Sequence, residues 1–338
     1  MKDPQATIRD IALKLNISIS TVSRAIRGVP EVNAETRKAV LEMAEKLNYE
    51  PNRVAQSLRI KKTNTLGVIV PEIAMHFFSS AISGMQEYSA SHGYSIMICQ
   101  SMESVAIEKS NIHMLVSNRV DGLLISLSSE TKNIDHLQQL VNKKIPIVLF
   151  DRVSDDLNVS KVIVDDHDGA FKAVDYLVKT GCKRIAHIAG PENLYISAQR
   201  KKGYLDALIK NGIAINEDLI IHCNNRHEDP IAATKKLLAH KPDAIFCMND
   251  PMAILAIQVI KANGLIIPDE VSVVGFTNEP VSSFIEPSLT TVSQPSSQMG
   301  KMAAKLFIDL VENEDSFAPI TEVIATELII RNSTRKMN

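Results

Sequence analysis

The sequence predicts an all-α domain in the first 50 residues, followed by a larger α/β region built on two parallel sheets. Short helices with capping residues and one apolar side account for the amino-terminal segment. From residue 65 onward, short apolar runs alternate with helical stretches, which is typical of parallel sheets covered by helices. At 338 residues the chain is also too long for one ordinary core.

The composition is that of a soluble globular protein, with 45% apolar and 22% charged residues. The amino terminus lacks an apolar signal segment, and no apolar run approaches the roughly 18 residues that span a bilayer. We therefore expect a cytoplasmic protein with no membrane partner. The four cysteines are far apart and lack metal-ligand spacing, so they predict neither a disulfide framework nor a zinc site.

Charge is distributed unevenly along the chain. Residues 1–62 contain twelve Lys and Arg against seven Asp and Glu, although the whole chain has a net charge of −2. A basic amino-terminal segment followed by an acidic remainder indicates a polyanionic partner for the amino-terminal segment alone.

The first predicted helix begins after Thr7, which can form a reciprocal cap with Asp10. Its apolar side comprises Ile8, Ile11, Ala12 and Leu15. The second helix begins after the capping residue Ser18 and ends in the turn at 27–30. Its inward residues are Val22, Ala25 and Ile26, and its solvent-facing residues are Ile19, Ser20, Ser23 and Arg24.

A third helix begins after Asn33 and ends before Pro51, and its predicted apolar stripe is Val40, Leu41, Ala44 and Leu47. Two helices joined by a tight turn and braced by a third form a helix-turn-helix. A small helical bundle without a binding role is the simpler alternative. The exposed face of the second helix favours DNA binding, because it is short and polar with a single Arg and fits a major groove without obstruction.

Two sets of apolar runs predict two parallel sheets with helices on both faces. The strands expected in the first sheet are 66–70, 94–98, 122–125 and 146–150. The strands expected in the second sheet are 161–164, 184–188, 244–247 and 271–274.

At this level of detail the chain closely resembles the LacI/GalR (lactose-repressor) family of bacterial transcription regulators. The amino-terminal segments that carry the resemblance are 7–12, 17–18, 20–24, 47–52 and 55–58. It extends over essentially the whole chain through the segments 67–71, 121–122, 249–250, 273–276, 289–292 and 330–333.

The resemblance implies that residues 1–50 read DNA and that residues 51–63 form a hinge, which becomes helical when two copies lie side by side on an operator. Leu58 would then enter the minor groove as a wedge, with neighbouring cations on phosphates. A solvated linker is the alternative interpretation. The implied DNA-binding residues are Thr7, Ser18, Ile19, Ser20, Thr21, Ser23, Arg24, Asn52, Arg53, Ala55, Gln56, Leu58 and Arg59. Among them, Ile19, Ser20 and Arg24 match base-contacting positions of the family.

For residues 64–338 the resemblance implies a two-lobed, periplasmic-binding-protein-like (type I) fold that binds an effector and dimerises. Lobe 1 would comprise residues 64–161 and 294–321, and lobe 2 residues 162–293 and 322–338. The chain would cross between the lobes near 162, 293 and 322, with the ligand in the cleft.

Open α/β sheets bind ligands beyond the carboxyl ends of their strands, which independently indicates the same place. The candidate ligand-binding residues there are Phe77, Phe78, Asp151, Arg200, Asn249, Thr277, Asn278 and Gln294. Several have simpler alternatives: Phe78 as core, Asp151 as a partner of Arg152 or Arg200, and Gln294 as a bridge between lobes. Asp250 has the pattern of a helix cap followed by proline, so Asn249 is the better ligand candidate.

The pair Thr277-Asn278 departs from the family pattern, in which many members have an Asp that accepts sugar hydroxyls. A neutral pair accepts weaker hydrogen bonds, so the sequence does not predict a particular hexose. A sugar or sugar derivative remains the expected effector, with a nucleobase, a sugar phosphate or another metabolite left open.

No catalytic, metal or cofactor motif is present: the sequence lacks a dinucleotide fingerprint, a P-loop, a nucleophile elbow and metal-ligand spacing. We therefore expect no enzyme activity, no cofactor and no metal. The resemblance implies a DNA-binding regulator, more often a repressor, that is controlled allosterically by its effector and forms a homodimer. The rival interpretation is a cytoplasmic α/β enzyme or sugar-binding protein with an incidental helical head, which would not bind promoter DNA.

Overall fold

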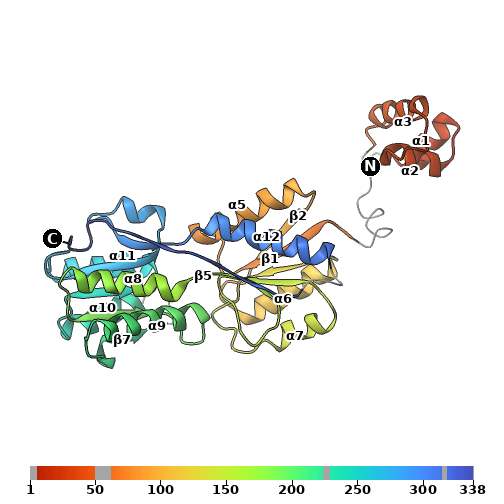
Figure 1. Cartoon of the computed structure of the whole chain (residues 1–338). Coiled ribbons are helices and arrows are strands. Elements are labelled where there is room, and N and C mark those ends of the chain that lie inside the picture. The colour runs from red at the N-terminus through yellow and green to blue at the C-terminus, as the bar shows by residue number, and fades with distance from the viewer. Residues whose placement is uncertain (1–5, 50–61, 224–228, 314–317, 338) are drawn as a thin grey trace. The chain divides into compact units, whose positions relative to one another are not determined.

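The computed structural model describes residues 6–49, 62–223, 229–313 and 318–337. The chain divides into two compact units, residues 1–63 and 64–338 (Figure 1). The hinge residues Asn52, Arg53, Ala55, Gln56, Leu58 and Arg59 lie outside the described residues. In the described ranges no helix is both long and apolar enough to cross a membrane.

The first unit is a three-helix domain of α1 (Ile8–Leu15), α2 (Ile19–Arg27) and α3 (Ala34–Lys46). Its buried core is small and comprises Ile11, Ala12, Val22, Ala25 and Val40.

The predicted helix ends of this unit are confirmed. The backbone N–H of Thr7 donates to the Asp10 carboxylate at 2.8 Å. The Ser18 hydroxyl accepts from the N–H of Thr21 at 3.0 Å, and Asn33 caps α3 in the same way.

One part of the predicted α3 stripe is wrong, because Leu41 is 46% exposed. The side chains that pack against the core around Val40 are Met43, Ala44 and Leu47. This set has the spacing i, i+3, i+4 and i+7, so Leu41 lies one residue outside the buried face.

In the second unit the first sheet is wholly parallel, in the order β11-β5-β4-β3-β1-β2. Its strands are β1 (Thr65–Val70), β2 (Ser95–Gln100), β3 (Gly122–Ile125), β4 (Ile147–Phe150), β5 (Ser160–Val164) and β11 (Thr321–Ile324). One face is covered by α5 (His76–Ser91) and α12 (Ser296–Glu312), and the other by α6 (Val105–Ser117) and α7 (Asp135–Asn142).

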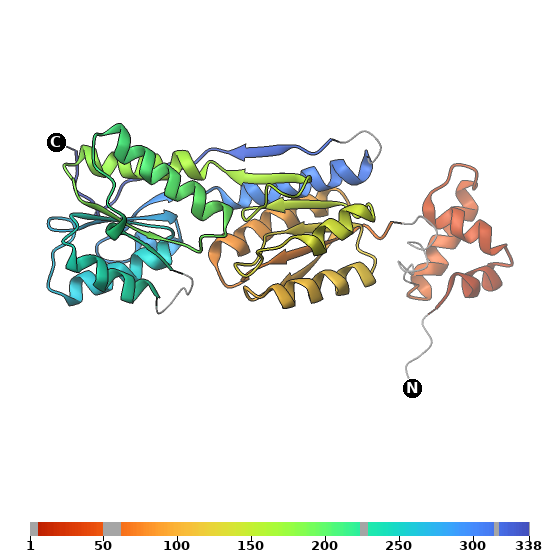
Figure 2. The same ribbon diagram turned by 90° about the horizontal axis from the view of Figure 1, so that it is seen from below.

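The second sheet has the order β12-β10-β9-β8-β6-β7, and only β12 runs antiparallel to its neighbour. Its strands are β6 (Ile185–Ala189), β7 (Ile220–His222), β8 (Ala244–Cys247), β9 (Ser272–Thr277), β10 (Thr290–Ser293) and β12 (Glu327–Ile329). The helices α8 (Asp166–Lys179) and α9 (Tyr195–Lys210) cover one face, and α10 (Asp229–Ala239) and α11 (Asp250–Ala262) the other. The two sheets form two lobes that lie end to end (Figure 2).

The predicted position of one strand needs correction. The segment 161–164 was expected in the second sheet, but β5 pairs with β4 and β11 in the first. The expected division after residue 161 and before residue 322 therefore splits two strands of one sheet. The crossings lie slightly later than expected, after β5, β10 and β11. The expectation failed because an apolar run predicts a buried strand but not the strands that pair with it.

The backbones of α5 and α12 approach closely through two glycines. A Cβ at Gly300 would overlap the carbonyl of Ala81, and one at Gly84 would overlap the carbonyl of Ser297. Since both obstacles are backbone atoms, neither can move aside by a rotamer change.

We expect Gly300→Val to destabilise the second unit by about 3 kcal/mol or more, because the added side chain forces the two helices apart. Urea unfolding of the full chain measures this loss. The control is Gln298→Val at an exposed position of the same helix, which should cost only about 0.5 kcal/mol through helix propensity. Equal losses for the two variants would contradict close helix packing as the cause.

Candidate functional site

The exposed face of α2 is the candidate interface of the first unit. Ile19 is 49% exposed, and Ser20 and Arg24 are also exposed. Thr7 and Ser18 are exposed at the amino-terminal ends of α1 and α2, while Thr21 and Ser23 are half-buried. The hydroxyls of Ser20 and Thr21 lie 2.7 and 2.8 Å from the Ser18 hydroxyl, so the start of α2 is a connected polar surface.

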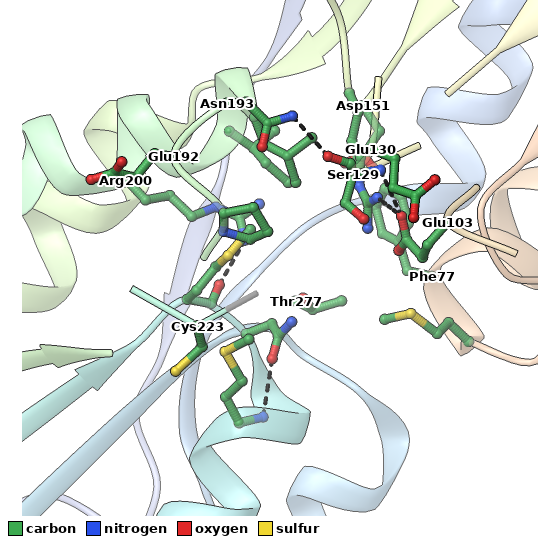
Figure 3. A pocket seen from close by; sticks show the side chains of 18 of the residues that line it. Phe77, Glu103, Ser129, Glu130, Asp151, Glu192, Asn193, Arg200, Cys223 and Thr277 are labelled. Carbon is green, nitrogen blue, oxygen red and sulfur yellow. Dashed lines mark hydrogen bonds and ion pairs between the residues drawn. The ribbon is translucent and has the colours of Figure 1, made fainter. Parts of the chain in front are cut away.

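In the second unit a cavity of about 1100 Å³ lies between the lobes (Figure 3). The segments that line it follow the carboxyl ends of β1, β2, β3 and β4 in one lobe and of β6, β7, β8, β9 and β10 in the other. The structure brings seven of the predicted ligand residues into this lining: Phe77, Phe78, Asp151, Arg200, Asn249, Thr277 and Gln294.

The eighth residue, Asn278, does not line the cavity. Its Oδ1 accepts a hydrogen bond from the Arg331 guanidinium at 2.8 Å, and its Nδ2 lies 3.4 Å from the Ser293 hydroxyl. The side chain therefore ties the end of β9 to the carboxy-terminal segment, and a ligand contact by Asn278 stays a prediction.

Several lining residues have unusual backbone conformations. Met102 and Glu103, at the end of β2, have φ of 53° and 61°, and Asp151 after β4 has a φ of 58°. Thr277 has a φ of 127°, which is rare for a β-branched residue. Such strain persists where the surrounding structure enforces it, and it clusters at ligand-binding sites.

In the first lobe, Arg152 is buried and pairs with Glu103 at 2.7 Å. The same Glu103 carboxylate accepts from the backbone N–H of Ser129 at 2.8 Å. The ion pair therefore joins the loops after β2, β3 and β4. Arg152 Nε is buried and has no hydrogen-bond partner among the described residues, although it lies 4.0 Å from Asp151.

Asp151 is buried in this lobe, and its burial raises the pKa of its carboxyl group from 3.8 to about 6. The charges of Arg152 and Arg200 act in the opposite direction but do not offset the loss of hydration. Its nearest hydrogen-bond donor is the Ser126 hydroxyl, at a long 3.5 Å. The carboxylate therefore keeps acceptor capacity for a ligand.

In the second lobe, Arg200 is buried and its Nε and second amino group lie 2.8 and 2.7 Å from one oxygen of Asp166. Its remaining amino group donates to the carbonyl of Met248 at 2.7 Å. The guanidinium carbon also lies 3.8 Å from the centre of the Phe276 ring. Arg200 is thus held in place on three sides and presents a fixed surface to the cavity.

The side chain of Asn249 caps α11 by accepting from the N–H of Met252 at 3.0 Å. Its neighbour Asp250 is buried away from the cavity and accepts from the N–H of Glu279 at 2.8 Å and from the hydroxyls of Ser282 and Thr291. These bonds give Asp250 a structural role. The expectation that Asp250 caps the helix is wrong, because Asn249 is the capping residue and Asp250 is the first residue of α11.

One hydrogen bond and one unpartnered donor lie where the two lobes meet. Asn193, after β6, donates from Nδ2 to the carbonyl of Ser129, after β3, at 2.8 Å (Figure 3). Gln294, at the second crossing, is buried, and its Nε2 lacks a partner among the described residues. The Asn193–Ser129 hydrogen bond therefore bridges the cleft, while Gln294 offers a free hydrogen-bond donor beside it.

Several lining residues were not predicted. They include Met75, Met102, Glu103, Ser129, Glu130, Lys132, Arg152, Glu192, Asn193, Ile196, His222, Cys223, Met248 and Met252. Most of them follow a strand end, so the rule that located Asp151 could have found them. Within the described parts of the chain, no three His, Cys, Asp or Glu side chains are grouped to hold a metal ion.

The matching families agree with this division of the chain. Residues 7–52 match the family described as bacterial regulatory proteins, lacI family, and residues 63–331 match periplasmic binding proteins and sugar binding domain of LacI family. A curated relative is the probable HTH-type transcriptional repressor ExuR of Bacillus subtilis, which is 35% identical over 98% of this chain and 99% of its own length.

Two solved structures are similar over nearly the whole chain. The lac repressor dimer bound to operator and an anti-inducer has a TM-score of 0.88 and 27% identity, covering 98% of this chain and 100% of that one. The complex of the transcriptional regulator CelR with cellobiose has a TM-score of 0.75 and 30% identity, covering 97% and 100%.

The raised pKa of Asp151 predicts a pH-dependent stability. Between pH 3.8 and about 6 the folded chain holds a proton that the unfolded chain has lost, so this carboxyl makes the native chain less stable as the pH rises. Asp151→Asn should therefore gain stability relative to the native chain from pH 4 to pH 6, by about 2 kcal/mol. Urea unfolding across this range measures the gain. Asp156→Asn, at an exposed position, is the control, and parallel pH profiles for Asp151→Asn and the native chain would refute the assignment.

Proposed function

The chain belongs to the LacI family of bacterial regulatory proteins, and from this membership we propose that it is a repressor whose operator affinity is set by a small polyhydroxylated effector between its lobes. Members of this family are DNA-binding transcription regulators rather than enzymes. A site for DNA and a site for a metabolite in one chain are what such control requires.

The observation that carries the proposal is the short, polar and exposed face of α2, held by the cap at Ser18. We assign residues 1–50 to DNA reading, 51–63 to the hinge and 64–338 to effector binding and dimerisation. In this assignment α2 lies in the major groove, where Arg24 makes a bidentate contact to guanine and Ile19 an apolar contact. We also propose that the protein acts in the cytoplasm, since a repressor must reach promoter DNA.

The cavity between the lobes supports a carbohydrate effector. It combines the aromatic rings of Phe77 and Phe78 with hydrogen-bonding groups that include Asp151, Asn249 and Gln294. Such a lining suits a sugar, because each sugar hydroxyl can donate and accept hydrogen bonds and the faces of the sugar ring are apolar. The cellobiose that CelR binds is a precedent in a similar fold.

Control of DNA affinity would follow from the relative orientation of the lobes. Three chain crossings and the Asn193–Ser129 hydrogen bond join them, so an effector that contacts both lobes changes their preferred orientation. A coupling of about 1–3 kcal/mol between the effector and DNA sites would change operator affinity by one to two decades. The effector would act as inducer or co-repressor according to the orientation that it stabilises.

We also propose that the chain acts as a homodimer. Phe284 is 85% exposed and lies beside the exposed Val281 on the turn after β9, where both side chains would be costly to leave in water. The lac repressor, which is similar over its whole length, is a dimer on its operator.

Arg24→Ala should reduce affinity for the operator by about 1–3 kcal/mol and relax the preference at one base pair, because a bidentate guanine contact is lost. Fluorescence anisotropy with operator duplexes substituted at each position measures both effects. Arg27→Ala removes the same charge from the same helix, although the Arg27 side chain donates to the carbonyl of Ser23, and it should weaken all duplexes alike. A uniform loss for Arg24→Ala would show that Arg24 contacts phosphate instead.

Phe284→Asp should convert the dimer to a monomer and weaken operator binding, because it places a charge in the proposed apolar interface. Sedimentation equilibrium gives the mass and anisotropy the affinity. Ile209→Asp, at another exposed apolar position of the second lobe, should leave both unchanged. A dimer that survives Phe284→Asp would place the interface elsewhere.

A further inference from the structure

The exposed face of α2 combines one apolar side chain with polar ones. Ile19 is the first residue of the helix and is 49% exposed, and the exposed Ser20 follows it. Ser23 and Arg24 lie one turn further along the helix, at the i+4 positions of Ile19 and Ser20, so the four side chains share one face. How well this face distinguishes one base from another depends on what each side chain can bond.

The hydroxyl of Ser20 discriminates poorly between bases. It lies 2.7 Å from the Ser18 hydroxyl, which also accepts from the backbone N–H of Thr21 at 3.0 Å. Because either oxygen of the Ser18–Ser20 pair can be the donor, Ser20 can offer a base either a donor or an acceptor. Every base pair presents both kinds of group in the major groove, so a hydroxyl that can do either selects none of them.

The side chain of Ile19 is selective for the opposite reason, because it cannot form a hydrogen bond at all. Against a polar base edge it would displace water and offer no hydrogen bond in return, which costs free energy. The 5-methyl group of thymine is the apolar group that the bases expose in the major groove. An isoleucine in a helix also has one strongly preferred rotamer, so it presents its apolar surface in a fixed direction.

From these observations we propose that Ile19 reads the 5-methyl group of a pyrimidine, so that each operator half-site has a thymine at the base pair that this side chain contacts. The inference rests on the proposed function, because it specifies what the DNA-reading unit recognises. Cytosine methylated at C5 presents the same methyl group at the same place in the groove. Methylation of a cytosine at that base pair therefore strengthens binding.

The first test removes the methyl group and nothing else. The full chain selects duplexes from a random pool, and deoxyuridine then replaces thymine at each position in turn while fluorescence anisotropy gives the affinity. One thymine in each half-site should show a loss of about fourfold, the effect of one buried methyl group, and about fifteenfold when both half-sites are changed. Ile19→Ala should bind the thymine and deoxyuridine duplexes equally, because its side chain is too short to cover the methyl group.

Two variants are matched controls for this measurement. Leu13→Ala shortens an apolar side chain of α1 that is 73% exposed, and Ser20→Ala changes the residue next to Ile19. Both should keep the loss on deoxyuridine that the native chain shows. The proposal is overturned if the native chain is insensitive to deoxyuridine at every thymine, if the loss persists in Ile19→Ala, or if a control variant abolishes it.

The second test restores the methyl group on a different base. The thymine–adenine pair that responds to deoxyuridine is replaced by cytosine–guanine, with or without a methyl group at C5 of the cytosine. The native chain should bind the methylated duplex about fourfold more tightly for each half-site, and Ile19→Ala should bind both duplexes equally. Equal binding by the native chain would overturn the proposal.

These outcomes separate the inference from the function on which it rests. A chain that selects no duplex from the pool would refute the proposed regulator together with this inference. Sequence-specific binding that does not respond to the methyl group would refute the inference alone.

Discussion

The geometry of the cleft depends on one constraint, the parallel pairing of strands in both sheets. Parallel strands end at the same edge, so the loops after nine strands converge on one cavity. The polar groups that follow these strands, such as Asp151 and Asn249, come from distant parts of the chain yet lie in one lining. Close convergence also explains the left-handed backbone at Glu103, Asp151 and Thr277, since short connections must turn sharply there.

Two ion pairs then hold this lining in shape, of which Arg200–Asp166 is buried and Arg152–Glu103 is partly exposed at Glu103. Arg152–Glu103 joins three loops of the first lobe, and Arg200–Asp166 joins α9 to the start of α8 in the second. Removing one partner from a buried pair such as Arg200–Asp166 leaves a buried charge and typically costs about 3–5 kcal/mol. The pairs are therefore better understood as fixing the shape and charge of the wall than as a source of net stability.

Much of this architecture could be predicted from the sequence, because local rules decide it. Caps at Ser18 and Asn33 and the strand-end rule at Asp151, Asn249 and Gln294 depend on short segments. What could not be predicted depends on distant partners. The sheet to which β5 belongs is decided by β4 and β11, and the role of Glu103 by an arginine 49 residues away. Similarly, the sequence does not predict the contact between Asn278 and Arg331, because these residues come together only in the folded chain.

The close packing of α5 and α12 has a consequence for synthesis on the ribosome. The glycine face of α5 is complete once residue 91 has emerged, but α12 begins only at residue 296, about 200 residues later. Because chain elongation proceeds at roughly 5–20 residues per second, this face stays uncovered for some ten seconds or more. The first lobe thus completes its core only after nearly the whole second lobe has been made, and the buried side of α5 lacks the cover of α12 throughout that interval.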